Sequence, residues 1–154
     1  MFKLLRMNNY YFIVGGSAAW AEIVRILQEK KIPFAWMKSD TEGAVSVPYE
    51  EIDEVIAAGF VPVVIGAECG RSDVKVLKKY RHHVNASPLE IVSVWEHAPL
   101  ATRWQELVLA HDEDCFNEFD YSTEIMRELC RRGFSRDEID KVRALDREIR
   151  GITG

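Results

Sequence analysis

The sequence predicts an α/β fold, a Rossmann-like parallel sheet of about four strands followed by a helical C-terminal half. Two short apolar runs, residues 10–16 and 60–67, have the unbroken hydrophobicity of strands that are buried on both faces. A helical pattern separates the first of them from a third apolar run at 32–40. Strand, helix and strand within about 30 residues make up the unit from which parallel sheets are built.

We expect three helices in the first half of the chain, at 17–31, 49–59 and 71–80. Ser17 is a suitable N-cap for the first helix, because apolar residues at helical spacing follow it. The second helix opens with glutamates, which favour a helix N-terminus, and Gly59 is a natural stop. Residues 82–86 come after the third helix, and we expect them to form the brief fourth strand.

The second half of the chain has only helical patterns, at 87–98, 102–114, 122–133 and 135–151. Ser87 followed by Pro88 is typical of the N-cap and first position of a helix. Ser135 and Glu138 have the spacing of a capping box, in which each residue satisfies a backbone N–H group of the other. Helices therefore dominate this half.

The bulk composition indicates one folded domain. The chain has 154 residues, of which 47% are hydrophobic and 29% charged, and this is enough for one core. No flexible linker separates the two halves. We therefore expect a single domain over 1–154, in which the helical half, 87–154, packs on the α/β half, 1–86.

Charge and cysteine content narrow the class of protein. The net charge of -5 argues against nucleic acid as a partner, since binding it needs a basic surface. No segment reaches the roughly 18 apolar residues of a membrane helix, so we expect no membrane contact. The three cysteines, Cys69, Cys115 and Cys130, show neither disulfide nor zinc spacing. Together these features favour a cytoplasmic protein.

The turn after the first predicted strand is a candidate site for a small phosphorylated ligand. Gly15 and Gly16 would let the backbone approach a ligand closely, and Ser17 begins a helix whose N-terminus attracts anions. Asp40, after the second predicted strand, stands where dinucleotide-binding domains place an acid for the ribose. The full GxGxxG pattern is absent, so the alternative is that the two glycines only turn the chain.

Two adjacent histidines, His82 and His83, form a second candidate site. Neighbouring side chains on a regular strand point to opposite faces, but at the end of a strand they can converge on one metal or phosphate. The stretch "RHHVN" (81–85) after a βαβ pattern resembles the Asp-His-His motif of the DHH phosphoesterase superfamily. Arg81 stands where that motif has its metal-binding aspartate, and "GGSAAW" (15–20) has none of the aspartates of the family's first motif.

The resemblance implies a Rossmann-like enzyme that hydrolyses phosphoesters with a divalent metal of the manganese type. His82 and His83 would be catalytic residues and metal ligands, and Asp73 lies in the stretch where a further catalytic aspartate could fall. Imidazole nitrogens and carboxylate oxygens suit manganese, iron or zinc, and "AHDED" (110–114) supplies another candidate ligand, Asp112. The alternative is that this acidic stretch is a polar surface loop.

Three hypotheses for function follow. The first is a metal-dependent phosphoester hydrolase acting on a nucleotide-like substrate, or a degenerate form of one. The second is a module that binds a nucleotide or phosphate without catalysis. The third is an interaction or structural protein that forms a homo-oligomer through its helical half. The first hypothesis predicts bound metal, and the second predicts that a nucleotide stabilises the protein. The third predicts a molecular mass in solution that depends on concentration.

Overall fold

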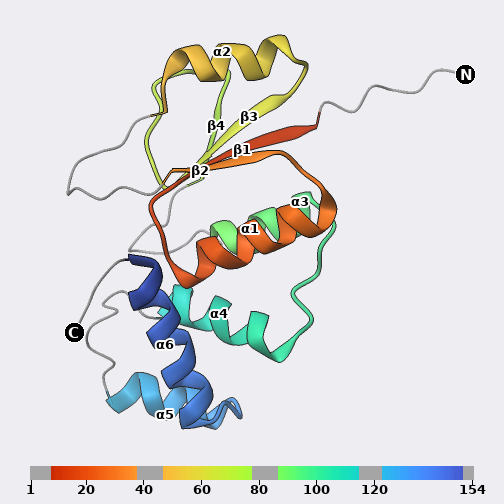
Figure 1. Ribbon diagram of the computed structural model, residues 1–154. Coiled ribbons are helices and arrows are strands. Elements are labelled where there is room, and N and C mark those ends of the chain that lie inside the picture. Colours follow the sequence, from red (N-terminus) through yellow and green to blue (C-terminus); the bar gives the residue numbers. More distant parts are fainter. Residues whose placement is uncertain (1–7, 38–46, 78–86, 115–122, 151–154) are drawn as a thin grey trace, which may run out of the picture. The chain divides into compact units, whose positions relative to one another are not determined.

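The computed structural model describes residues 8–37, 47–77, 87–114 and 123–150. Within these residues the chain forms a four-stranded parallel sheet and six helices (Figure 1), which confirms the predicted α/β fold. The chain divides into two compact units. The sheet unit comprises Met1–Gly15 and Leu27–Lys78, and the helical unit comprises Gly16–Ile26 and Lys79–Gly154.

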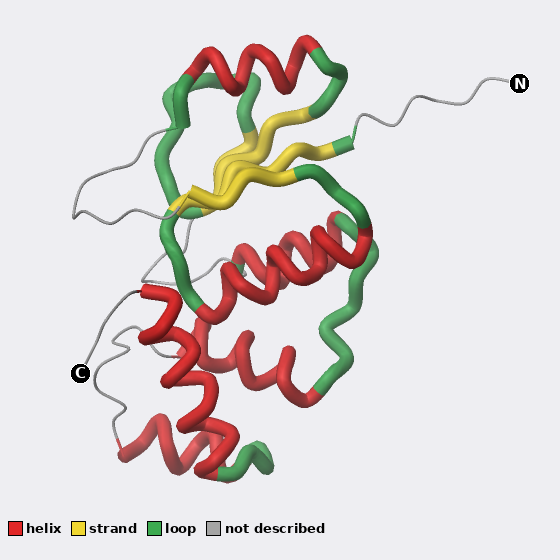
Figure 2. The backbone as a smooth tube through the Cα atoms, viewed as in Figure 1, coloured by secondary structure: helices red, strands yellow, loops and turns green. Residues whose placement is uncertain are grey.

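The sheet unit contains the strands β1 (Asn9–Val14), β2 (Phe34–Met37), β3 (Val61–Ile65) and β4 (Lys75–Leu77), and the helix α2 (Tyr49–Ala57). The strands, which are yellow in Figure 2, form one sheet in the order β2-β1-β3-β4, and all neighbours are parallel. Tyr11 of β1 pairs with Phe34 on one side and with Val63 on the other. The chain therefore builds outward from β1 to β2 and then returns to the opposite side of β1 for β3.

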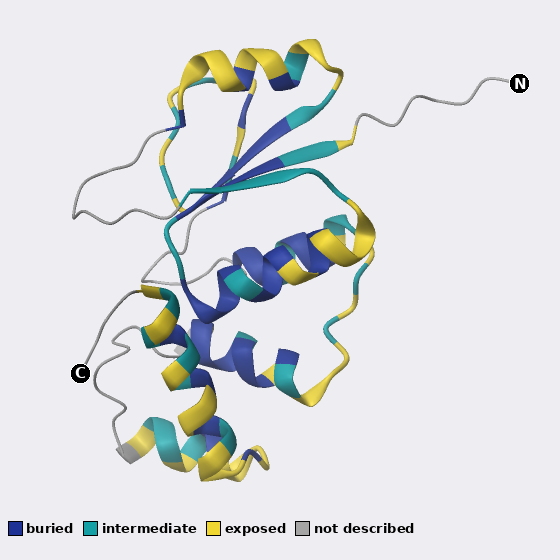
Figure 3. Ribbon diagram, viewed as in Figure 1, coloured by how far each residue is buried: buried dark blue, intermediate teal, exposed yellow. Residues whose placement is uncertain are grey.

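Alternate strand residues bury both faces of the sheet, which explains the unbroken apolar runs. Phe12, Val14 and Val64 form a core with Ile52 and Val55 of α2. The intervening residues of β1 and β3 are also fully buried; they are Tyr11, Ile13, Val63 and Ile65. Figure 3 shows the buried residues along the central strands, whereas the outer side of α2 is exposed.

The prediction of a helix at 71–80 is wrong over residues 71–77, the part of it that the structure describes. Residues 72–73 form a turn, and the following residues form β4, in which Val76 pairs with Val64 of β3. β-Branched side chains fit the pleated surface of a sheet, and pairing with β3 outweighs the weak helix preference of the neighbouring lysines. The fourth strand predicted at 82–86 lies outside the described residues.

The helical unit contains α3 (Pro88–Trp95), α4 (Arg103–Asp114), α5 (Thr123–Arg131), α6 (Arg136–Arg150) and most of α1 (Ala18–Lys30), whose last turn belongs to the sheet unit. The four helices predicted after residue 86 are confirmed. The two predicted N-terminal caps are also confirmed. Ser87 Oγ accepts the backbone N–H of Leu89. The Ser135 N–H donates to the Glu138 carboxylate at 3.0 Å, and the Glu138 N–H donates to the Ser135 hydroxyl at 3.2 Å. No helix in the described part of the chain is long and apolar enough to cross a membrane.

Candidate functional site

The helical unit holds every buried polar or charged side chain among the residues that the structure describes. They are Ser17, Glu22, Ser87, Ser93, Gln105, His111, Asp112 and Asp146. Burying a charged group is costly unless it is paired or hydrogen-bonded, so the acids in this set depend on partners within the protein. Those partners form separate small networks around Asp146, Asp112 and Glu22.

Asp146 of α6 is only 1% exposed, and its contacts reach three helices. Its Oδ1 atom accepts the backbone N–H of Ala18 in the first turn of α1 at 2.8 Å, and its Oδ2 atom accepts Nε of Arg150 at 2.6 Å. The Nε2 atom of His111 on α4 lies 3.6 Å from Oδ1. The first N–H groups of a helix lack partners within it and carry the positive end of its dipole. The Asp146 carboxylate therefore occupies the anion-binding end of α1.

The surroundings of Asp146 keep it ionised. Burial by itself raises the pKa of this carboxyl group, but the facing His111 ring, the Ala18 N–H and the Arg150 guanidinium lower that pKa to about 2. At neutral pH both carboxylate oxygens are therefore acceptors, and neither carries a proton.

The residues predicted to hold a phosphate at the start of α1 are engaged by the protein itself. Ser17 Oγ accepts the N–H of Trp20 at 3.1 Å, which is the contact of an N-cap. Gly16 lies against the last turn of α6, because a Cβ atom there would be 2.7 Å from Cγ2 of Ile149. Together with the carboxylate at the α1 N-terminus, these contacts place α6 where a ligand would approach Gly16 and Ser17.

Gly15 is the member of the predicted phosphate site that belongs to the sheet unit. Its φ of 85° is left-handed, a conformation that glycine adopts without strain. Its N–H donates to the carbonyl of Met37 at 2.9 Å, and its carbonyl accepts Nε1 of Trp36 at 2.6 Å. Gly66 follows β3 with a similar φ of 87°, so the two central strands end alike. Asp40 lies outside the described residues.

Asp112 of α4, a predicted metal ligand, is 4% exposed and bonded to the start of α3. Its Oδ2 atom accepts the hydroxyl of Ser87 at 2.7 Å, while the same hydroxyl oxygen accepts a backbone N–H in the first turn of α3. Ser87 therefore caps a helix and holds Asp112 at once. Asp112 is therefore a buried helical residue, and the alternative that its stretch is a polar surface loop does not hold for it. The histidines expected beside it, His82 and His83, lie outside the described residues.

Asp73, the remaining catalytic candidate, is exposed and belongs to the sheet unit. Arg71 holds it through two parallel bonds, from Nη2 to Oδ2 at 2.7 Å and from Nε to Oδ1 at 3.0 Å. The same guanidinium donates to Oδ1 of Asp53 at 2.6 Å. Hydrogen bonding from Arg71 lowers the pKa of Asp73. Asp73 is thus paired with an arginine in one unit, and Asp112 is bonded to a serine in the other.

Asp146 and Glu22 were not among the residues singled out from the sequence. Asp146 follows Ile139 by two helical turns, so both lie on the buried stripe of α6. An acidic residue at this apolar spacing is the feature of the sequence that could have identified Asp146. Glu22 of α1 accepts Nε2 of Gln105 at 3.0 Å and Nε of Arg25 at 2.7 Å. Glu22 therefore bonds α1 to α4, in addition to the contact through Asp146.

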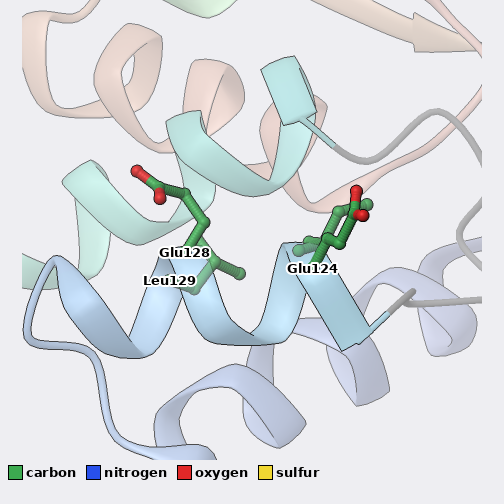
Figure 4. A pocket seen from close by; sticks show the side chains of 4 residues that line it. Glu124, Glu128 and Leu129 are labelled. Carbon is green, nitrogen blue, oxygen red and sulfur yellow. The ribbon is translucent and has the colours of Figure 1, made fainter.

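A search of the described residues finds no metal-binding group, and a hollow beside α5 does not involve the predicted site. Among the described residues, no three His, Cys, Asp or Glu side chains gather into a group that could hold a metal ion. A hollow of about 210 Å³ lies along α5 (Figure 4), and its wall consists of Glu124, Ile125, Glu128 and Leu129. None of the predicted site residues is in that wall.

Comparison of the chain with protein-family models, with curated proteins and with solved structures found no match. The resemblance to the DHH phosphoesterase superfamily therefore remains an expectation from the sequence. The function has to be inferred from the contacts of the helical unit and the topology of the sheet.

We expect Gly16→Ala to destabilise the protein, because its methyl group collides with Ile149. Overpacking of this kind lowers the free energy of unfolding by about 1–3 kcal/mol, which chemical denaturation measures. Ile149→Ala removes the Cγ2 atom, so the same glycine substitution should cost clearly less in that background. Gly70→Ala is the matched control, since its Cβ atom would meet only the Tyr49 hydroxyl at 3.5 Å. Equal costs of Gly16→Ala in both backgrounds would refute the contact.

We expect Asp146 to make the stability depend on pH in the acid range. Its folded pKa of about 2 lies below the ordinary value of 3.8, so its contribution is complete above about pH 4 and is lost as the pH falls toward 2. The shift corresponds to about 2 kcal/mol. Urea denaturation at several pH values should show a steeper acid loss for the wild type than for Asp146→Asn. Glu148→Gln, an exposed change on the same helix, should follow the wild type, and parallel curves for all three would contradict the prediction.

Proposed function

We propose that this chain is a metal-dependent phosphoester hydrolase acting on a nucleotide-like substrate, or a degenerate relative that has kept the metal and lost catalysis. Asp112 is a metal ligand in this proposal, together with His82 and His83. The observation that carries it is the bond between the Ser87 hydroxyl and the buried Asp112 carboxylate.

That bond limits how far Asp112 lies from the paired histidines. Ser87 follows His83 by four residues, and four residues of extended chain span at most about 14 Å. A carboxylate that touches Ser87 is therefore within reach of imidazoles on the segment that precedes it. This proximity in the chain supports a shared site for Asp112 and the two histidines, which themselves lie outside the described residues.

Asp112 also has the donor chemistry that a divalent cation needs. The Ser87 hydroxyl that donates to its Oδ2 atom is neutral, so this bond itself brings no positive charge to the carboxyl group. Carboxylate oxygen with imidazole nitrogen is a donor set that manganese, iron and zinc accept. When bound, such a metal neutralises phosphate charge and lowers the pKa of a bound water molecule. The described residues do not supply three ligands, so the proposal requires the histidines.

The degenerate form of the proposal follows from Arg81. The DHH motif has an aspartate at the corresponding position, whereas a guanidinium cannot coordinate a metal and repels it. Residues 15–20 also lack the acids of the family's first motif. We therefore expect metal binding to persist more readily than turnover.

Metal analysis of protein prepared without a histidine tag tests the proposal. After dialysis against manganese we expect about one equivalent of bound metal per chain, and nearly none in Asp112→Asn or His82→Ala. Asp140→Asn is the matched control, because it makes the same change at an exposed position of α6 and should keep the metal.

Hydrolysis of a chromogenic phosphate diester by the metal-loaded protein separates the two forms of the proposal. Turnover that Asp112→Asn abolishes supports the enzyme, and bound metal without turnover supports the degenerate form. Wild-type protein that binds no manganese, iron or zinc at millimolar concentration would refute both.

A second candidate, a non-catalytic nucleotide or phosphate module, is favoured by the topology of the sheet. The strand order reverses between β1 and β3, and ligands of open parallel sheets bind beyond the carboxyl ends of the strands at such a point. Gly15 and Gly66 follow those two strands and present no Cβ atom to a ligand. The Ala18 N–H at the start of α1 already donates to Asp146, so a phosphate there would have to displace a carboxylate.

Thermal denaturation with ATP, GTP, NAD and inorganic phosphate tests this module. A ligand at a hundredfold excess over its Kd should stabilise the protein by about 2.7 kcal/mol, with no hydrolysis product. Asp40→Asn should weaken the effect of the nucleotides and spare that of phosphate, because the acid is expected to bind the ribose. Unchanged melting temperatures with all four ligands at millimolar concentration would count against the module.

A further inference from the structure

Three groups from three helices surround the carboxylate of Asp146. Its Oδ1 atom accepts the backbone N–H of Ala18 at 2.8 Å, and its Oδ2 atom accepts Nε of Arg150 at 2.6 Å. The Nε2 atom of His111 lies 3.6 Å from Oδ1. An N–H at the positive end of a helix and a guanidinium are groups that proteins use to bind phosphate. The start of α1 is therefore part of a site for one anion, and the anion in it belongs to the chain.

Only the last turn of α6 brings this carboxylate to α1. Ile139 and Val142, earlier in the helix, are fully buried and hold its body in the core. After Asp146 every described residue of α6, from 147 to 150, is half-buried or exposed. Segments with few buried apolar contacts open at a lower free energy than the core does. The last turn can therefore separate from α1 while the rest of α6 stays packed.

Ile149 closes the same turn over the residue that leads into α1. A Cβ atom at Gly16 would lie 2.7 Å from Cγ2 of Ile149, so α6 approaches more closely than a side chain at position 16 would permit. A ligand that reaches the Ala18 N–H must therefore displace Ile149 as well as Asp146. Both residues lie within one helical turn, so one movement removes both obstacles.

We infer that the last turn of α6, residues 146–150, is an autoinhibitory strap: Asp146 and Ile149 close the start of α1, and a phosphate-bearing ligand binds there only after this turn is released. The inference rests on the second candidate function, the nucleotide or phosphate module, and describes its regulation. The ligand binds only the released form, so its apparent affinity falls in proportion to the fraction of molecules in that form. Substitutions that weaken the strap should therefore tighten binding.

Calorimetric titration with inorganic phosphate and with ATP tests the strap. Ile149→Ala removes the closing side chain, changes no charge and should bind phosphate more tightly than the wild type. Asp146→Ala also removes the competing carboxylate, and its affinity for phosphate should rise by about tenfold or more. Glu148→Ala is the matched control, because it removes the same charge from an exposed position of α6 and should bind as the wild type does.

The Ile149→Ala variant decides the outcome, because Ile149 is only half-buried and the variant keeps the buried Asp146 contacts. Tighter phosphate binding in this variant supports the strap, and unchanged binding overturns it whatever Asp146→Ala does. Equal gains in Asp146→Ala and Glu148→Ala would show a general effect of charge and would also overturn it.

Hydrogen exchange measures the movement itself in the wild type. With phosphate bound, the amides of residues 147–150 should exchange faster, whereas those of Ile139 and Val142 should not change. Bound phosphate without faster exchange at 147–150 would overturn the strap.

The strap and the module fail in distinguishable ways. ATP that binds the wild type and Ile149→Ala with equal affinity refutes the strap and leaves the module standing. Phosphate that binds Ile149→Ala more tightly, with no ATP binding to any variant, refutes a nucleotide ligand and leaves the strap standing. Absence of binding by both ligands in all four proteins refutes both.

Discussion

The carboxylate of Asp146 is the contact on which the arrangement of the helical unit depends. It meets the first turn of α1, pairs with Arg150 on its own helix and faces His111 of α4. Apolar side chains can repack in several ways, whereas hydrogen bonds to a charge are directional and a buried charge without partners is costly. Three helices are therefore fixed to one point, and the packing of Gly16 against Ile149 follows from the same approach of α6 to the start of α1.

A common principle relates the buried acids of this unit to its helix ends. Asp146 bonds directly to a backbone N–H of α1, and Asp112 bonds to α3 through the hydroxyl of its N-cap, Ser87. The positive end of a helix is the natural place for a negative group in a protein interior. In many nucleotide-binding proteins the helix after the first strand uses this end for a phosphate. Here the chain supplies the anion itself, which is why the catalytic proposal centres on Asp112 and not on the glycine turn.

Most elements of the fold could be predicted from the sequence because local signals agree with the tertiary structure. The runs that form β1 and β3 are apolar on both faces, and the helices after Ser87 carry caps that the structure confirms. The segment that forms β4 was predicted as a helix because it is short and carries lysines, and only pairing with β3 decides its conformation.

The candidate site was harder to predict than the fold. Asp112 was recognised by its residue type, whereas Asp146 was overlooked because it is one of many charged residues along α6. Its burial depends on α1 and α4, which are distant in sequence, and no local pattern reports such contacts. Ser17 and Gly16 were recognised as special, but local sequence does not reveal that their neighbour is a helix of the same chain.

The boundary between the two units runs through α1, and the helical unit takes in Gly16–Ile26 from the middle of the sheet unit's sequence. No single cut can release either unit as one continuous fragment. A chain truncated before the C-terminal helices would keep the beginning of α1 while losing the carboxylate that bonds to it. During synthesis the start of α1 likewise leaves the ribosome long before Asp146 is added, so completion of the helical unit has to wait for the last helix.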